Sequence, residues 1–416
     1  MKSLFTIREG GAANWTLRVI TMVAIVGLML YIPTKWEAGT LNTAIEGLTY
    51  MSAAMALNLV LGYTGQISIG HSAFLGIGAY TTGIMVSRWG FSPWVTFPVA
   101  FGIAFVIGVL ISFPAARIKG VYLALVTLAL GLVFPQLATW KKLAWITGGG
   151  SGLPIACPAT GVSRSCEGTE VPTTGFNIGP KSKGQMQTFE IFGWNPFGDL
   201  RRPDNKAAFY YWIALVVAII VYLACRGVVK SRVGRSLIAI RDNETAAAVM
   251  GVNLVRTKAF VFGLSAGLCA LPGCVTAIKT GGVSPEGIIN MTVRGAITFL
   301  IVMVIGGAGS LAGPVIGGAL YVFVVDKTGT WADDDKIPGV LRPFFAWSEI
   351  PPGDGIFAVL LILLMFVAPR GIAGLWKQYI HRIVRVIPRP AGAIGATPAM
   401  ATATATPTSN HEGEPQ

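Results

Sequence analysis

The chain has 416 residues, of which 53% are hydrophobic and only 12% are charged, and its mean hydropathy is +0.63. A soluble globular chain carries about 25% charged residues, so this composition excludes an ordinary soluble domain and predicts a membrane protein. The net charge of +13 does not call for nucleic acid as a partner, because Lys and Arg gather in the cytoplasmic loops of membrane proteins.

Long apolar stretches predict the fold class. A helix needs about 20 mostly apolar residues to cross the hydrocarbon core, and the sequence lacks the alternating pattern of a β-barrel. We therefore predict an all-α integral membrane protein, a polytopic bundle of about ten transmembrane helices. Eight is the lower bound, because the last three candidates are short. The predicted spans are 17–32, 40–61, 72–86, 94–113, 120–138, 209–225, 259–277, 295–305, 311–325 and 355–367.

Two loops of opposite charge orient these spans. Residues 226–258 carry seven basic and two acidic side chains, whereas residues 326–354 carry three basic and six acidic ones. Positive loops stay in the cytoplasm, so we expect the first loop inside and the second outside. Ten spans with both termini in the cytoplasm satisfy both expectations. A role in orientation alone is the simpler explanation for the basic loop.

The segments outside the spans are assigned by composition. We expect a cytoplasmic N-terminus (1–16), a transmembrane domain (17–370) with an extracytoplasmic insert (141–208), an amphipathic interfacial helix (371–387) and a disordered tail (388–416). The apolar face of the amphipathic helix has two possible supports, the inner leaflet or another protein. Cys157 and Cys166 lie in the insert and are either a disulfide or two free thiols.

The sequence offers no constellation for catalysis. It has no Gly-x-x-x-x-Gly-Lys-[Ser/Thr] loop for ATP, and its three histidines are too scattered for a metal site. Residues 263–267 spell Gly-x-Ser-x-Gly, but they lie in an apolar stretch, where the two glycines favour close helix packing over a nucleophile elbow. We expect no enzyme activity, no metal and no cofactor bound by this chain.

Two glycine-rich runs should interrupt helices at membrane depth. Such a break is tolerated only where protein or a water-filled cavity satisfies the backbone, so the first run, 62–80, is a candidate wall of a translocation pathway. Tight packing of small residues is the alternative for both runs. The polar residues expected to border the pathway are Asn58, Gln66, Ser68, His71 and Ser72. The glycines expected to break or pack helices are Gly65, Gly70, Gly306, Gly307, Gly309 and Gly313.

From about residue 40 to residue 370 the chain resembles the M-type permease of branched-chain amino acid ATP-binding-cassette importers. The segments that carry the resemblance, in the order expected of the family, are 56–71, 120–129, 147–149, 233–235, 239–244, 251–253 and 306–318.

The resemblance implies a permease in the plasma membrane of a prokaryote that moves Leu, Ile or Val into the cytoplasm. It also implies partners: a second, related permease forming a heterodimer, two ATPase subunits that bind ATP, and an extracytoplasmic substrate-binding protein. Urea and short-amide permeases are similar over the same segments and remain the alternative. An ion-coupled secondary carrier is more distant, because only His71 and Glu46 are candidate ionisable groups inside a span.

The basic loop resembles the segment that couples such a permease to its ATPases. Thr245-Ala246-Ala247-x-x-x-Gly251 is similar to the Glu-Ala-Ala-x-x-x-Gly signature, with Thr in place of Glu and Glu244 one residue earlier. Asn243 is a good N-cap, so we predict a helix over 243–249 within a docking segment that runs from Arg241 to Gly251. A solvated loop helix is the alternative. The predicted coupling residues are Arg241, Asp242, Asn243, Glu244, Ala246, Ala247 and Gly251.

Overall fold

The computed structural model describes residues 36–115, 121–154, 203–285 and 293–333, with the shorter stretches 5–8, 176–180, 186–191, 371–375 and 384–387 and a few single positions. The chain divides into two units, one of residues 29–376 and one of residues 1–28 with 377–416. The predicted spans 17–32 and 355–367 lie almost wholly outside the described residues. Cys157, Cys166 and the tail 388–416 lie outside them as well.

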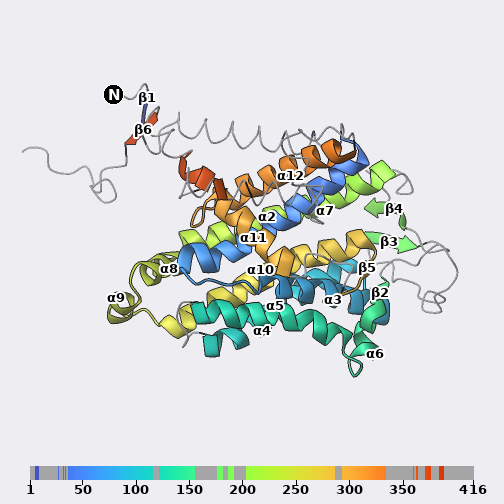
Figure 1. Cartoon of the computed structure of the whole chain (residues 1–416), viewed down its shortest axis with the longest axis horizontal. Helices are drawn as coiled ribbons and strands as arrows, with labels where there is room; N and C mark the ends of the chain where they lie inside the picture. The colour runs from blue at the N-terminus through green and yellow to red at the C-terminus, as the bar shows by residue number, and fades with distance from the viewer. Residues whose placement is uncertain are drawn as a thin grey trace, which may run out of the picture. The chain divides into compact units, whose positions relative to one another are not determined.

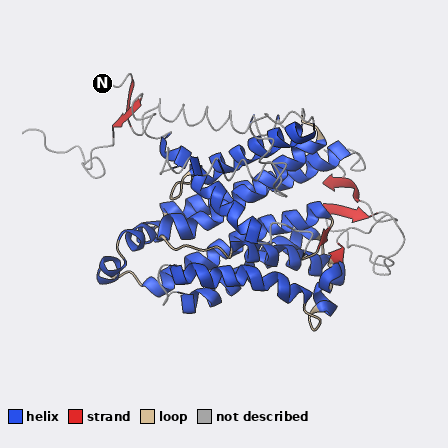
Figure 2. Cartoon of the chain, viewed as in Figure 1, coloured by secondary structure: helices blue, strands red, loops and turns tan. Residues whose placement is uncertain are grey.

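Long helices make up most of the larger unit (Figures 1 and 2). Each coincides with a predicted span and extends it by one to six residues at most ends. The helices are α2 (Ala38–Thr64), α3 (His71–Trp89), α4 (Pro93–Ala115), α5 (Val121–Thr139), α7 (Pro203–Lys230), α10 (Leu254–Thr280), α11 (Val293–Gly306) and α12 (Ala312–Asp333).

Four of these helices are long and apolar enough to cross a membrane, namely α2, α4, α7 and α10. A fifth span is present if Ala124–Thr139 of α5 and the segment Ala144–Ser151, which begins with the short α6 (Ala144–Thr147) and meets α5 at 85°, form one broken crossing. The described residues therefore form a predominantly helical membrane protein. The count of ten spans, and the cytoplasmic placement of both termini, stay predictions.

The strands are short and form three separate pairs. In the larger unit, β2 (Leu153–Pro154) pairs antiparallel with β5 (Gly282–Val283), and β3 (Phe176–Pro180) pairs antiparallel with β4 (Met186–Ile191). A 3-10 turn, η1 (Gly149–Ser151), precedes β2.

The smaller unit holds a parallel pair, β1 (Phe5–Arg8) with β6 (Val384–Ile387). Residues 371–375 are helical, but β6 occupies the end of the segment for which we expected one amphipathic helix, 371–387. Val384, Val386 and Ile387 are β-branched, and such side chains favour a strand once a partner strand is present.

Two helices form the centre of the bundle. In the apolar windows of α10 and α2, 94% and 83% of the residues are buried, against 28% in α4 and 39% in α7. The ring of Tyr50 on α2 packs at a tilt against Phe299 of α11 and edge-on against Tyr321 of α12, with ring centroids 5.4 and 4.7 Å apart. The exposed, apolar flanks of α4 and α7 are what hydrocarbon covers in a membrane protein.

Glycines allow α10 to lie close to α3 and α4. A Cβ added at Gly273 would collide with the carbonyl of Leu75, and one at Gly78 would collide with the carbonyl of Ala270. Gly263 and Gly267 face the α4 backbone at Phe105 and Phe101. The Gly-x-Ser-x-Gly sequence thus lies inside a helix and packs against another, as predicted.

The connecting segments gather at the two ends of the bundle. Figure 1 shows α8 (Arg232–Asp242) and α9 (Glu244–Val249) at one end, with α6, β2 and β5 at the opposite end. The basic loop and the start of the insert thus lie at opposite ends of the bundle, while the side of the membrane that each one faces stays a prediction. Since α7 continues to Lys230 and α10 begins at Leu254, the basic loop between these helices is 231–253.

The close contact between α3 and α10 predicts a large effect from one methyl group. Gly273→Ala should lower the free energy of unfolding by about 1–3 kcal/mol, because the new Cβ has no room unless the helices move apart. Gly102→Ala is the matched control, since nothing lies within 4 Å of a Cβ at Gly102. Thermal unfolding in detergent compares the two. Equal midpoints for both variants would contradict the packing described.

Candidate functional site

The first glycine run ends one helix and starts the next. Gly65 adopts a left-handed conformation (φ 72°), and its N–H donates to the carbonyl of Leu61, which closes α2. Residues 65–70 are not helical, and α3 begins at His71. Gly70 lies so close to the backbone of Thr127 on α5 that a Cβ would collide with its carbonyl. The predicted break is confirmed.

His71 connects three helices inside the core. Its side chain is 1% exposed, its Nδ1 lies 2.9 Å from the Ser68 hydroxyl, and its Nε2 lies 2.8 Å from the hydroxyl of Ser265 on α10. Ser265 in turn donates to the carbonyl of Ala56 on α2. The ring also packs edge-on against Phe74 and Phe262.

Burial with only hydroxyl partners favours a neutral imidazole for His71, and these partners select its tautomer. Because the Ser265 hydroxyl donates its proton to a carbonyl, its oxygen accepts a hydrogen bond, and this places the imidazole proton on Nε2. Nδ1 then accepts from Ser68. Every donor in the chain Ser68–His71–Ser265–Ala56 is satisfied, so this buried polar group fixes α2, α3 and α10 relative to one another.

The predicted pathway residues are all partly or fully buried. Ser68 and Ser72 are fully buried, Asn58 is 1% exposed, and Gln66 is half-buried. Among the described residues the Ser72 hydroxyl has no hydrogen-bond partner. The structure thus gathers Ser68, His71 and Ser72 at the start of α3 and places Asn58 two turns before the end of α2. Whether they border a translocation route stays a prediction.

The second glycine run forms a turn between α11 and α12. Gly307 and Gly309 have positive φ angles of 117° and 76°, and Gly306 and Gly313 approach each other's segment so closely that neither has room for a Cβ. Ser310 caps α12, because its hydroxyl accepts from the N–H of Gly313 at 3.0 Å. We call residues 307–311 the glycine turn.

Asn58 holds the glycine turn with both ends of its amide. Its Nδ2 donates to the carbonyl of Ser310 and its Oδ1 accepts from the N–H of Gly309, each at 2.9 Å. A turn within a helical bundle leaves backbone groups unpaired, and the Asn58 side chain supplies one donor and one acceptor for them.

The basic loop folds into two short helices instead of one. Ser231 caps α8, and α8 ends at Asp242. Asn243 caps α9 by accepting from the N–H of Ala246 at 3.0 Å. The helix predicted over 243–249 is confirmed as α9, while the segment from Arg241 to Gly251 as a whole is broken at Asn243, whose φ and ψ of −159° and 109° are extended.

Two charged side chains attach this loop to the bundle. Arg241 Nη1 donates to the carbonyl of Gly62 near the end of α2 at 3.0 Å, and it lies beside exposed Asp242, with Nε to Oδ1 at 3.5 Å. Glu244 Oε1 accepts from Lys258 Nζ of α10 at 2.7 Å, and the Lys258 side chain is only 4% exposed. Within α9, Ala247 is buried, whereas Ala246 is exposed.

The C-terminal end of α9 is apolar, and we call Val249 and Met250 the α9 tip. Val249 and Met250 are 83% and 84% exposed, and Gly251 turns the chain with a φ of 86° in open space. These two adjacent side chains form a small exposed apolar surface in a basic, polar loop.

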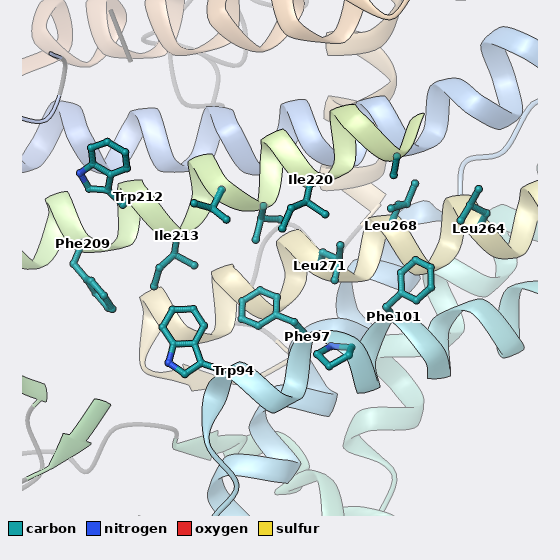
Figure 3. A pocket seen from close by; sticks show the side chains of 14 residues that line it. Trp94, Phe97, Phe101, Phe209, Trp212, Ile213, Ile220, Leu264, Leu268 and Leu271 are labelled. Carbon is teal, nitrogen blue, oxygen red and sulfur yellow. The ribbon is translucent and has the colours of Figure 1, made fainter. Parts of the chain in front are cut away.

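A cavity of about 730 Å³ lies between α4, α7 and α10. Figure 3 shows Trp94, Phe209 and Trp212 at one end of it and Phe101, Leu264 and Leu268 toward the other. All its lining residues are apolar or aromatic, and none of the predicted pathway residues is among them.

Sequence reasoning gave no role to three residues of these contacts, namely Lys258, Ser265 and Ser310. Lys258 carried a weak signal, a cation at the start of an apolar helix with an acidic residue in the loop before it. Ser265 was noticed only as part of the Gly-x-Ser-x-Gly sequence. Among the described residues no group of three His, Cys, Asp or Glu side chains could hold a metal ion.

Helices broken at glycine turns, with a capped and basic loop at one end, define a polytopic membrane protein of the transporter type. The chain belongs to the family described as the permease component of branched-chain amino acid transport systems, whose sequence profile matches residues 39–369.

Individual relatives agree with the family. The chain is 28% identical to the high-affinity branched-chain amino acid transport system permease protein LivM of Escherichia coli, over 84% of this chain and 74% of the relative. It is 25% identical to the LivM protein of Salmonella typhimurium, with the same coverage. A xylose transport system permease protein of Haemophilus influenzae is 32% identical, but over only 28% of this chain. No solved structure matches the chain.

The His71 network predicts that Ser265 matters for stability. Ser265→Ala should lower the free energy of unfolding by about 1–3 kcal/mol, since Nε2–H of His71 loses its acceptor in a buried place. Ser236→Ala is the control, because that hydroxyl bonds only its own α8 backbone at the surface, and its effect should stay within about 0.5 kcal/mol. Thermal unfolding in detergent is the measurement, and a larger loss in Ser236→Ala would refute the network's role.

Proposed function

We propose that this chain is the permease subunit of an ATP-binding-cassette importer that moves branched-chain amino acids, Leu, Ile and Val, into the cytoplasm. The observation that carries the proposal is the family match over residues 39–369, which includes both glycine-rich breaks and the basic loop. The names of the two LivM relatives support the substrate class.

The proposal assigns the energy source to partner proteins. We infer two ATPase subunits, which bind the ATP, a second and related permease that forms a heterodimer with this chain, and an extracytoplasmic protein that delivers the substrate. The complex would lie in the plasma membrane of a prokaryote. This chain would supply half of the route and one docking surface for an ATPase, with no ATP site of its own.

The docking surface is the α9 tip, Val249 and Met250. Several features of the structure suit it to this role. α9 is capped by Asn243, its buried Ala247 faces the bundle, and the ion pair between Glu244 and Lys258 fixes its first residue to α10. A short helix held from beneath, with two apolar side chains outward, can insert into a groove of a partner.

The polar residues at the break before α3 remain our proposal for the border of the route. Intramembrane polar groups of a transporter mark its pathway by default. Because Ser68, His71 and Ser72 are covered in this chain, the proposal requires that α3 and its neighbours move apart during transport.

The substrate is tested with the complete importer. The permeases, ATPases and binding protein should be reconstituted in proteoliposomes, and uptake of leucine, isoleucine and valine should require ATP and the binding protein. Calorimetry on the binding protein gives an independent result. Binding of urea or a short amide, with none of the three amino acids, would overturn the substrate and leave the permease function in place.

A charged side chain introduced at the α9 tip tests whether this tip docks on the ATPase. Met250→Asp should reduce both copurification of the ATPase and ATP-dependent uptake by about tenfold or more, since a charge buried without a partner costs well over the 1.4 kcal/mol that corresponds to a factor of ten. Val255→Asp is the control, because Val255 is also exposed and lies just beyond the loop, in the first turn of α10. An equal loss in both variants would argue against docking at the tip.

A further inference from the structure

We propose that Arg241 and Asn58 form a polar link through which the basic loop moves the glycine turn and the start of α12. This inference rests on the proposed function, because it concerns how an event at the ATPase reaches the membrane helices. It assigns Asn58 a role as a positioning residue and distinguishes it from the residues proposed to contact substrate.

The link runs through the last turns of α2. Arg241 donates to the carbonyl of Gly62, and Asn58, one helical turn earlier, holds Gly309 and Ser310. A Cβ placed on Gly309 would lie 3.1 Å from both Arg241 Nη1 and the Gly62 oxygen. The guanidinium, the end of α2 and the glycine turn therefore meet at one point.

The helix end explains why Arg241 binds there. Within a continuous helix the carbonyl of Gly62 would accept from the N–H of Gln66, but the chain turns at Gly65 and that N–H instead reaches Val60. The Gly62 carbonyl is thus one of the last carbonyls of α2, where the helix dipole favours a cation. Arg241 supplies both the donor and the charge.

The glycine turn is directly connected to the start of α12. Ser310 is held by Asn58 through its carbonyl and caps α12 through its hydroxyl. Gly313 lies against Gly306 and against Gly307 of the turn, with no room for a side chain at Gly306 or Gly313. Further along α12, Gly318 also packs closely against Met51 of α2. A shift of residues 309 and 310 must therefore move the first turn of α12.

A second attachment of the loop bypasses Asn58. The ion pair between Glu244 and Lys258 connects α9 to α10, and α10 reaches α2 through Ser265. The two attachments make separate connections, one to the glycine turn and one to the His71 cluster. Loss of the Arg241 attachment should leave ATPase docking in place while weakening transmission to α12.

The test uses Arg241→Met and Asn58→Leu, which keep side-chain size and remove the hydrogen bonds. In proteoliposomes containing the complete importer, each variant should hydrolyse ATP at the wild-type rate while the uptake per ATP falls about tenfold, the effect expected for loss of a charge-assisted or bidentate hydrogen bond. The double variant should be no worse than the poorer single variant, because both act on one link. Arg241→Lys, which can still donate to Gly62, should restore part of the coupling.

Arg232→Ala is the matched control, because Arg232 has the same charge on the same helix and is exposed. Its uptake per ATP should equal that of the wild type. Arg241 is 41% exposed, so its variants test the link even if Asn58→Leu fails to assemble. Parallel loss of hydrolysis and uptake, or no loss in either, would overturn the link. A wild-type complex without ATP-dependent uptake would instead overturn the proposed function.

Discussion

Backbone groups that cannot be left unpaired in an apolar environment determine how this bundle is built. Two helices end at glycine-rich breaks, at residues 65–70 and 307–311, and each break frees carbonyl and N–H groups that need partners. Side chains from other helices supply these partners. Thr127 of α5 accepts from the N–H of Ile69, and Asn58 of α2 holds the second turn.

The same constraint explains the dense packing of glycine against backbone. Between helices in lipid, association depends on van der Waals contact and hydrogen bonds, because apolar side chains gain little by leaving an apolar solvent. Gly78 and Gly273 bring α3 and α10 into backbone contact, and the fixed distance places Ser265 within reach of His71. The outer helices α4 and α7 leave most of their apolar surface open, although Gly263 and Gly267 also bring α10 against the backbone of α4.

Local patterns predicted the elements, and long-range contacts escaped prediction for a physical reason. Apolar windows located α2 to α5, α7 and α10 to α12, since a helix at membrane depth must be apolar along its whole length. Asn243 was recognised as a cap because capping involves residues three apart. The partner of His71 is 194 residues away and that of Asn58 is 251 or 252 residues away, and one sequence carries no signal for such distances. The strand β6 was missed because pairing with a second strand overrides local helix propensity.

Two polar contacts of α2 serve different purposes, although the residues that make them, Ala56 and Asn58, lie only two positions apart. At Ala56 the helix accepts from Ser265, inside a cluster that is closed to solvent and in which every donor has a partner. At Asn58 the helix holds a glycine turn that also touches Arg241, whose side chain is partly in solvent. A fully satisfied and buried cluster resists displacement, whereas a contact with a solvated guanidinium is exchanged for water at small cost. The first arrangement therefore stabilises the closed packing of α2, α3 and α10, which the proposed opening of the route must disrupt. The second suits a joint about which the end of α2 and the start of α12 can shift.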